Sequence, residues 1–304
     1  MSELKEKLPK LIAVVGPTAS GKTSISLELC RAIGGEVVSM DSMQIYEGLK
    51  IGTARISPKE ARGVSHSMLG IIPPNKPYSV AEYVADALPI IAGILSLSSV
   101  PVLVGGTGLY LDGIRYERSF GSAPASPVLR EKLEHLTNEE LYSALLMLHK
   151  EAASRVHPAN RRKVIRYIEI ITMSGKPPSP NERKPRYDVL PIGIHVPKEI
   201  LDKRIEERVR AMTDAGLVDE VRSLLASGVS RAAQSMQAIG YKEIIEYLDG
   251  NRTLDEAVER IIIGTRQYAK RQMTWFRRTE GIVWFDAEDT AGIIEAAKRF
   301  LYSP

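Results

Sequence analysis

Cysteine is almost absent from this chain, which has a single one, Cys30, among 304 residues. One thiol cannot form a disulfide within the chain, and it cannot build a zinc site from cysteines. The scarcity of cysteine favours a reducing compartment, so we expect a cytoplasmic protein. We also expect no signal peptide, because the polar residues 2–7 lead directly into the first predicted strand.

Long apolar runs are missing as well. The most apolar stretch, 88–104, is interrupted by Pro89, Gly93 and Pro101, and we therefore expect no membrane span. Hydrophobic residues make up 44% and charged residues 26% of the chain, which is typical of a globular protein that folds in water. The net charge of +4 weakly indicates a polyanionic partner.

Residues 16–23 match the pattern G-x-x-x-x-G-K-[ST] at every position, between an apolar run at 11–15 and a helical pattern at 24–33. In a strand–loop–helix setting, the loop amides and the helix dipole face an anion, Lys22 adds a positive charge and Thr23 can ligate a metal. A tight turn before a helix would explain the glycines but not Lys22 and Thr23. The sequence therefore predicts a phosphate site made of Gly16, Pro17, Thr18, Ala19, Ser20, Gly21, Lys22 and Thr23.

Strand and helix patterns alternate outside a central segment, which favours an α/β fold with a P-loop-type parallel sheet flanked by helices. The expected strands are 11–15, 36–40, 101–104, 189–196 and 282–285, and the longer helices are 78–97, 201–225 (broken near Gly216) and 254–278. The segment 48–77 reads as loop-rich. We predict a catalytic core domain, 1–113 and 188–304, and an all-helical insertion domain, 114–187. Within the insertion we expect no strands, and helices at 129–136, 138–150 and 159–173.

Two predicted strands end in polar or glycine-rich segments. The strand 36–40 ends on Asp41-Ser42-Met43-Gln44, and the strand 101–104 ends on Gly105-Gly106-Thr107-Gly108. Ligands of parallel sheets collect at the carboxyl ends of strands, so Asp41 either lies beside the phosphate or caps the segment that follows it. No apolar strand ends in the separate aspartate that a nucleoside-triphosphate hydrolase uses for magnesium, and the hydrolase interpretation loses support.

Three basic segments have more than one interpretation. Residues 150–186 contain ten Lys or Arg against three acids, which indicates either a solvated helix face or an RNA-binding one. Arg204 and Arg208 share a helix face, and they either pair with neighbouring glutamates or reach the phosphate site. Residues 266–278 interleave aromatics with arginines, as a stacking surface for RNA does, but Tyr268, Trp275 and Phe276 could equally be core residues.

Taken together, these motifs resemble the bacterial tRNA dimethylallyltransferase (tRNA isopentenyltransferase) family, over nearly the whole chain. The matching segments occur in the family's order and lie at 16–23, 41–46, 52–55, 105–110, 160–169, 237–241 and 271–277. Two departures are mild: Arg161-Arg162 replaces a more acidic or small residue before the basic helix, and His66-Ser67 stands where a His-His pair is frequent.

The resemblance implies transfer of a dimethylallyl group from dimethylallyl diphosphate to N6 of adenosine-37, beside the anticodon of tRNA, with release of diphosphate. It implies Lys22, Thr23, Asp41 and Thr107 as catalytic residues, with Asp41 as general base, Arg208 as a further diphosphate ligand and Mg²⁺ held at Thr23. The adenine must be flipped out of its stack to react. For tRNA, the implied contacts are Asp41, Ser42, Met43, Gln44, Thr107, Arg130, Arg162, Lys163, Arg166, Gln237, Gly240, Tyr241, Arg271 and Trp275.

We expect a monomer that binds the anticodon stem-loop and no membrane. Three other functions remain open: a small-molecule P-loop kinase, an RNA-remodelling NTPase, and a prenyltransferase acting on free adenylates. Only a tRNA prenyltransferase moves label from dimethylallyl diphosphate into tRNA, so that assay separates it from the kinase and the NTPase. A comparison of tRNA with AMP as acceptor separates it from the prenyltransferase of free adenylates.

Overall fold

A computed structural model describes residues 8–117, 126–178 and 184–303. The chain divides into two compact units, one of residues 1–115 with 186–304 and one of residues 116–185. These boundaries lie two residues from the predicted ones. The larger unit contains the sheet, and the smaller one is built from helices.

The sheet of the larger unit has six parallel strands in the order β3-β2-β4-β1-β7-β8. The strands are β1 (Lys10–Val15), β2 (Gly35–Ser39), β3 (His66–Ser67), β4 (Val100–Gly105), β7 (Asp188–His195) and β8 (Val283–Asp286). The five predicted strands are present. The two-residue edge strand β3 falls in the segment predicted to be loop-rich, and it is too short to show any hydrophobic alternation.

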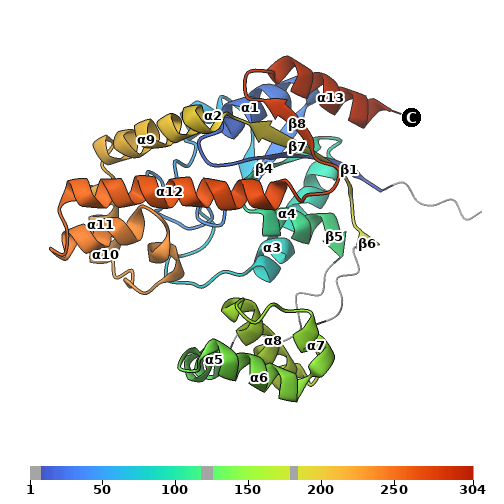
Figure 1. The fold of residues 1–304 in the computed structure, drawn as a ribbon. Coiled ribbons are helices and arrows are strands. Elements are labelled where there is room, and N and C mark those ends of the chain that lie inside the picture. Colours follow the sequence, from blue (N-terminus) through green and yellow to red (C-terminus); the bar gives the residue numbers. More distant parts are fainter. Residues whose placement is uncertain (1–7, 118–125, 179–183, 304) are drawn as a thin grey trace, which may run out of the picture. The chain divides into compact units, whose positions relative to one another are not determined.

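Helices cover both faces of this sheet, as fully buried parallel strands require. Ile12 and Val14 of β1 face a core formed with α1 (Lys22–Ile33) and α13 (Thr290–Tyr302), while the residues that alternate with them, Leu11 and Ala13, are equally buried on the other face. Figure 1 shows α1 and α13 on one side of the sheet and α3 (Val80–Ser96) and α4 (Gly108–Arg115) on the other.

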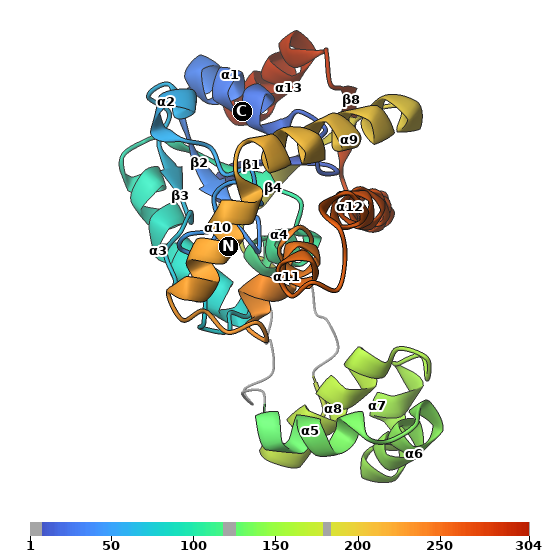
Figure 2. The ribbon, with the colours of Figure 1, turned by 90° about the vertical axis from the view of Figure 1, so that its left-hand side faces the viewer.

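The remaining helices of the larger unit complete the edge where the strands end (Figure 2). They are α2 (Pro58–Ala61), α9 (Lys198–Asp214), α10 (Leu217–Ala226), a 3₁₀ turn (Gln234–Gln237), α11 (Tyr241–Leu248) and α12 (Leu254–Phe276). The predicted break near Gly216 is confirmed: this glycine separates α9 from α10 with φ of 99°, a conformation that glycine adopts without strain.

The smaller unit contains α5 (Pro127–Glu134), α6 (Asn138–Leu148), α7 (Lys150–Ser154) and α8 (Arg161–Ser174), which pack around Leu141, Leu145 and Val164. Two predictions are corrected here. Strands β5 (Tyr116–Glu117) and β6 (Lys184–Pro185) form a short antiparallel pair where none was expected. The predicted helix 138–150 ends at His149, whose extended backbone stops α6 and whose ring accepts the Ala152 N–H to cap α7.

None of the helices within the described residues has the length and hydropathy needed to cross a membrane.

Candidate active site

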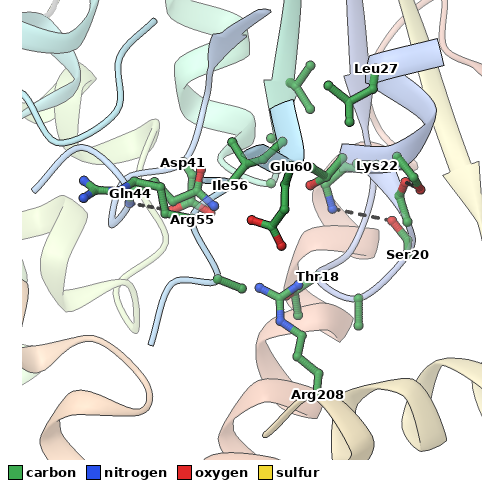
Figure 3. A pocket seen from close by; sticks show the side chains of 18 of the residues that line it. Thr18, Ser20, Lys22, Leu27, Asp41, Gln44, Arg55, Ile56, Glu60 and Arg208 are labelled. Carbon is green, nitrogen blue, oxygen red and sulfur yellow. Dashed lines mark hydrogen bonds between the residues drawn. The ribbon is translucent and has the colours of Figure 1, made fainter. Parts of the chain in front are cut away.

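A cavity of about 530 Å³ lies where β1, β2 and β4 end, within the larger unit. Its walls come from six parts of the chain: the loop after β1 with the start of α1, the segment after β2, residues 54–62, the end of β4, helix α9 and helix α12. Figure 3 shows Lys22, Asp41, Glu60 and Arg208 projecting into the same space. The sequence-predicted phosphate residues 18–23 and Asp41 therefore line one site.

The loop 16–21 turns sharply between β1 and α1. Gly16 and Gly21 have φ of 150° and 87°, and Ala19 also has a positive φ, of 62°. A side chain at Gly16 would meet the Ile194 carbonyl at 3.0 Å, so only glycine lets the loop pass this close to β7. The Lys22 ammonium folds back over the loop and donates to the Pro17 carbonyl and, at 3.5 Å, to the Ser20 hydroxyl (Figure 3).

Two partly buried cations, Lys22 and Arg208, dominate the electrostatics of the cavity. Burial, with the Arg208 charge as a second cause, lowers the pKa of Lys22 to about 7, and Asp41 only partly opposes this. Burial also lowers the pKa of Arg208, with Asp41 again opposing. Because two desolvated positive groups face one another, a bound anion would favour the charged form of both. The chain thus presents an anion site with Lys22 and Arg208 on opposite sides.

Arg208 reaches the cavity, while Arg204 does not. The Arg208 guanidinium donates to the Thr53 carbonyl at 3.4 Å, and Arg204 pairs with Glu288 at 3.2 Å. Among the described residues, Glu206 pairs instead with Arg210 and Arg266, and Glu207 pairs with Lys203. The first of the two interpretations left open by the sequence is therefore wrong for both arginines, and the second holds for Arg208 alone.

Asp41 has both of the predicted positions. Its Oδ1 accepts the N–H groups of Met43 at 2.8 Å and Gln44 at 3.3 Å, which caps the turn after β2. The same side chain lines the cavity and interacts with the Lys22 charge. The cap fixes the carboxylate in the orientation from which it faces the cavity.

Thr107 is held against the Asp41 segment. Its hydroxyl oxygen accepts the Ser42 N–H at 3.2 Å, and its own N–H donates to the Met40 carbonyl at 3.2 Å. A side chain at Gly105 would lie 2.3 Å from that carbonyl, so the glycine permits the contact between the two strand ends. The structure thus brings Asp41 and Thr107 together, as the sequence predicted from their positions.

Gln44 is already oriented by the protein. Its amide nitrogen donates to the Thr53 carbonyl at 3.1 Å, and its amide oxygen accepts from Ser39 at 3.3 Å. The segment that carries Thr53 is itself fixed by Glu220, which accepts the N–H groups of residues 50, 51 and 52 at 3.0, 2.7 and 3.1 Å. Sequence analysis missed Glu220, because a glutamate on an amphipathic helix gives no sign that it binds a distant loop.

Of the three tRNA contacts predicted in the segment 237–241, one is exposed and two are buried. Gln237 is exposed and donates to the Arg231 carbonyl at 2.8 Å. Gly240 is buried and gives its N–H to Glu243, and Tyr241 is fully buried, with its hydroxyl on Glu220 at 2.6 Å and its ring against Gly52. The structure therefore corrects the prediction that Gly240 and Tyr241 contact tRNA, since both belong to the core in this conformation.

Helix α12 divides its aromatic residues between core, cavity and surface. Phe276 is fully buried, Tyr268 lines the cavity, and Trp275 is 42% exposed and lies over Gly108. Arg271 is exposed and sits 5.7 Å from the Tyr268 ring centre. The core interpretation thus holds for Phe276 and not for Trp275, and the RNA-binding interpretation of Trp275 and Arg271 stays a prediction.

Several residues of the cavity were missed by sequence analysis. They are Arg55, Glu60, Arg62 and Gln272. Arg55 and Gln272 had a usable signal, because they lie within the segments 52–55 and 271–277 that carried the resemblance. The others reach the cavity through folding of segments far apart in the chain.

The predicted tRNA-binding arginines of the smaller unit surround a buried acid. Glu169 is fully buried and pairs with Arg130 at 2.7 Å and with Arg166 at 3.5 Å. Arg162 and Lys163, one turn earlier on α8, are exposed. The four predicted residues therefore lie on the α5–α8 side of this unit, with a carboxylate holding two of them.

Comparison with known proteins gives consistent matches over most of the chain. The model of the IPP transferase family matches residues 44–279, and that of the isopentenyl transferase family matches residues 9–70. A tRNA dimethylallyltransferase of Corynebacterium jeikeium is 44% identical over 284 residues, which cover 91% of this chain and 91% of that protein.

Solved structures match as well. The full-length tRNA isopentenylpyrophosphate transferase of Bacillus halodurans aligns with a TM-score of 0.73 at 41% identity, over 96% of this chain and 95% of its own. A eukaryotic dimethylallyltransferase acting on tRNA aligns with a TM-score of 0.85 at 27% identity, over 96% of this chain and 79% of its own.

Proposed function

The chain belongs to the tRNA dimethylallyltransferase family, and from this premise we propose that the cavity at the strand ends is where its two substrates react. The enzyme transfers a dimethylallyl group from dimethylallyl diphosphate to N6 of adenosine-37 in tRNA and releases diphosphate. One observation carries the assignment of the site: the cations Lys22 and Arg208 and the carboxylate Asp41 line a single cavity.

The diphosphate lies between Lys22, Arg208 and the amides of the loop. Breaking the bond between C1 of the dimethylallyl group and the diphosphate oxygen builds negative charge on that oxygen. The two partly buried cations and the N-terminus of α1 stabilise this charge more strongly than water would, because the cavity is desolvated. These groups therefore make diphosphate a better leaving group.

Asp41 accepts the proton from the adenine amine. The lone pair of N6 is delocalised into the purine ring, so the amine becomes an effective nucleophile only as its proton is removed. As the bond from N6 to C1 forms and the bond from C1 to oxygen breaks, this proton passes to the Asp41 carboxylate. Thr107, next to Asp41, and Gln44 are placed to hold the adenine edge.

The site offers one side-chain ligand for magnesium, the Thr23 hydroxyl. Thr23 offers a hydroxyl at the start of α1, and the described residues contain no group of three or more His, Cys, Asp or Glu that could hold a metal. A Mg²⁺ ion that keeps several waters and binds mainly through diphosphate oxygens needs only such a hydroxyl. When bound, it would neutralise charge on the diphosphate. We expect chelation with EDTA to slow transfer, and Thr23→Ala to raise the magnesium concentration needed for half-maximal rate.

Two surfaces supply candidate contacts to tRNA. On the larger unit they are the exposed Arg271, Trp275 and Gln237, with Ser42 and Met43 near the cavity. On the smaller unit they are Arg130, Arg162, Lys163 and Arg166. A monomer in the cytoplasm remains part of the proposal; tRNA as substrate supports the location, and light scattering of the purified protein tests the monomer.

The decisive experiment incubates the protein with dimethylallyl diphosphate labelled in its dimethylallyl group and with unmodified tRNA. We expect label in tRNA, lost when adenosine-37 is replaced, and none in free AMP. Phosphate transfer from ATP to a small molecule would support a kinase, and RNA-stimulated ATP hydrolysis without label in tRNA would support a remodelling NTPase. Label in AMP but not in tRNA would contradict the proposed acceptor.

A further inference from the structure

Gln272 of α12 joins the two loops that form the cavity. Its side-chain oxygen accepts the Thr18 N–H at 2.9 Å, and its side-chain nitrogen donates to the Gly106 carbonyl at 3.1 Å. Thr18 belongs to the phosphate loop after β1, and Gly106 follows β4. The residue is only 6% exposed, so both hydrogen bonds are shielded from water.

The amide lies directly against the backbone at Gly106. A side-chain carbon at Gly106 would lie 1.9 Å from the Gln272 amide nitrogen, so a larger residue there would displace the amide from its position. The same carbon would lie 3.7 Å from the Gly16 carbonyl oxygen, which shows how closely the two loops approach. Gln272 therefore fills the contact between them.

Only a carboxamide can make both hydrogen bonds. The Thr18 N–H needs an acceptor and the Gly106 carbonyl needs a donor, and glutamine provides one of each at the end of a single side chain. Glutamate would keep the acceptor but set an anionic oxygen against the carbonyl. Methionine would keep the volume and lose both bonds.

The bond to Thr18 also affects the phosphate loop. Because its N–H is given to Gln272, Thr18 does not direct that N–H at a bound anion. The diphosphate is left to the amides further along the loop, beside Lys22 and Thr23. Gln272 thus helps determine where along the loop the leaving group lies.

Neighbouring turns of α12 contact the same strand-end loop. Tyr268, one turn before, is within hydrogen-bonding reach of Thr107 and Gln272, and Trp275, one turn after, covers Gly108. Arg271 and Trp275 are also among the candidate tRNA contacts. The helix that would contact the tRNA is therefore also the helix that fixes the loops around the proposed dimethylallyl diphosphate site.

We infer that Gln272 is a positioning residue for the transfer reaction, which rests on the function proposed above. It acts through the two loops, and it sets the distance between the diphosphate cradle at Lys22 and the adenine side at Asp41 and Thr107. Loss of its hydrogen bonds slows the step in which the substrates react and leaves the binding of each substrate nearly unchanged.

The test compares Q272M and Q272E with Q267M, a matched control, since Gln267 is an exposed glutamine on the same helix. The rate of a single turnover is measured with both substrates saturating and is expressed per site that binds diphosphate, counted by titration calorimetry. A misplacement of about 1 Å costs on the order of 100-fold in rate. We expect Q272M and Q272E to be about 10- to 100-fold slower per competent site, with diphosphate Kd within about 3-fold and Q267M like the wild type.

A wild-type rate per competent site in both Gln272 variants would overturn the inference, because their only defect would then be a smaller folded fraction. A parallel loss of diphosphate affinity that accounts for the slower rate would overturn it as well. Should Q272M not fold, Q272E alone decides, since it keeps the volume and the acceptor for Thr18. If wild type and Q267M transfer no label to tRNA, the proposed function itself is wrong, and this inference falls with it.

Discussion

At the scale of single residues, Asp41 carries two tasks that can be separated by substitution. Its Oδ1 caps the turn through Met43 and Gln44, and its carboxylate faces the cavity. Asparagine keeps the capping oxygen but is not a base, while alanine loses both functions.

We expect Asp41→Asn and Asp41→Ala each to lower kcat by about 100-fold or more, because neither can accept the proton from N6. Affinity for tRNA, measured by filter binding, should change little. Asp214→Asn at the exposed end of α9 serves as the control. If Asp41→Asn turned over normally while Asp41→Ala did not, Asp41 would be a structural cap and not the base.

The lowered pKa of Lys22 predicts how the affinity for dimethylallyl diphosphate depends on pH. This pKa is lowered to about 7 in the free protein, and a bound diphosphate raises it again. At pH 8 to 9 the free protein therefore carries a neutral Lys22 and the complex a charged one, so binding takes up a proton and affinity falls as pH rises above 7. We expect Kd for dimethylallyl diphosphate to rise on the order of 10-fold from pH 7 to 9.

Titration calorimetry in buffers of different ionisation enthalpy measures this uptake directly. Tyr268, which also lines the cavity, has a pKa raised to about 12 by burial and does not titrate in this range. Lys22→Met should bind more weakly and lose the pH dependence between 7 and 9. An unchanged pH profile in that variant would assign the proton to another group.

At the scale of elements, the segment 50–53 shows how a single side chain can shape a loop. Glu220 of α10 accepts three consecutive N–H groups there and the Tyr241 hydroxyl as well. The Thr53 carbonyl in this loop then accepts hydrogen bonds from two cavity residues, the Gln44 amide and the Arg208 guanidinium.

Glu220→Ala should reduce the free energy of unfolding by about 2–4 kcal/mol, because it leaves several partly buried N–H donors without an acceptor. Urea unfolding followed by tryptophan fluorescence measures this. The exposed Glu47→Ala is the matched control, with an expected change within about 0.5 kcal/mol. Equal stability of the two variants would show that water replaces the carboxylate at no cost.

The same scale shows what the sequence could and could not predict. Strands such as β1 and β4 are continuous apolar runs, and the P-loop has a fixed spacing, so both were predicted from local patterns. By contrast, Tyr241 looks like a surface aromatic in the sequence, and its burial depends on Gly52, nearly two hundred residues away. The roles of Gln272 and Glu220 depend on tertiary contacts too, and periodicity contains no signal for them. The break at His149 is a local cap, which lies inside a continuous helical pattern and was therefore missed.

At the scale of the whole molecule, the tRNA contacts proposed above lie on two separate units. The smaller unit has exposed charge at Arg162 and Lys163, next to the Arg130–Glu169–Arg166 group. If the proposal is right, charges on this unit add affinity for tRNA without affecting dimethylallyl diphosphate, because the cavity proposed for the diphosphate is lined by residues of the larger unit.

The double variant R162A/K163A should weaken tRNA binding by about 10-fold or more at moderate salt. It should also reduce the steepness of log K against log salt by about 1 to 2, because fewer phosphate contacts form and fewer counterions are released on binding. Lys176→Ala is the control, because it removes the same kind of charge from the same unit beyond the other end of α8. Kd for dimethylallyl diphosphate should stay the same in both proteins. If Lys176→Ala changed the salt slope, per charge removed, as much as the double variant does, the unit would attract tRNA through net charge alone, and the assignment of specific contacts to α8 would be wrong.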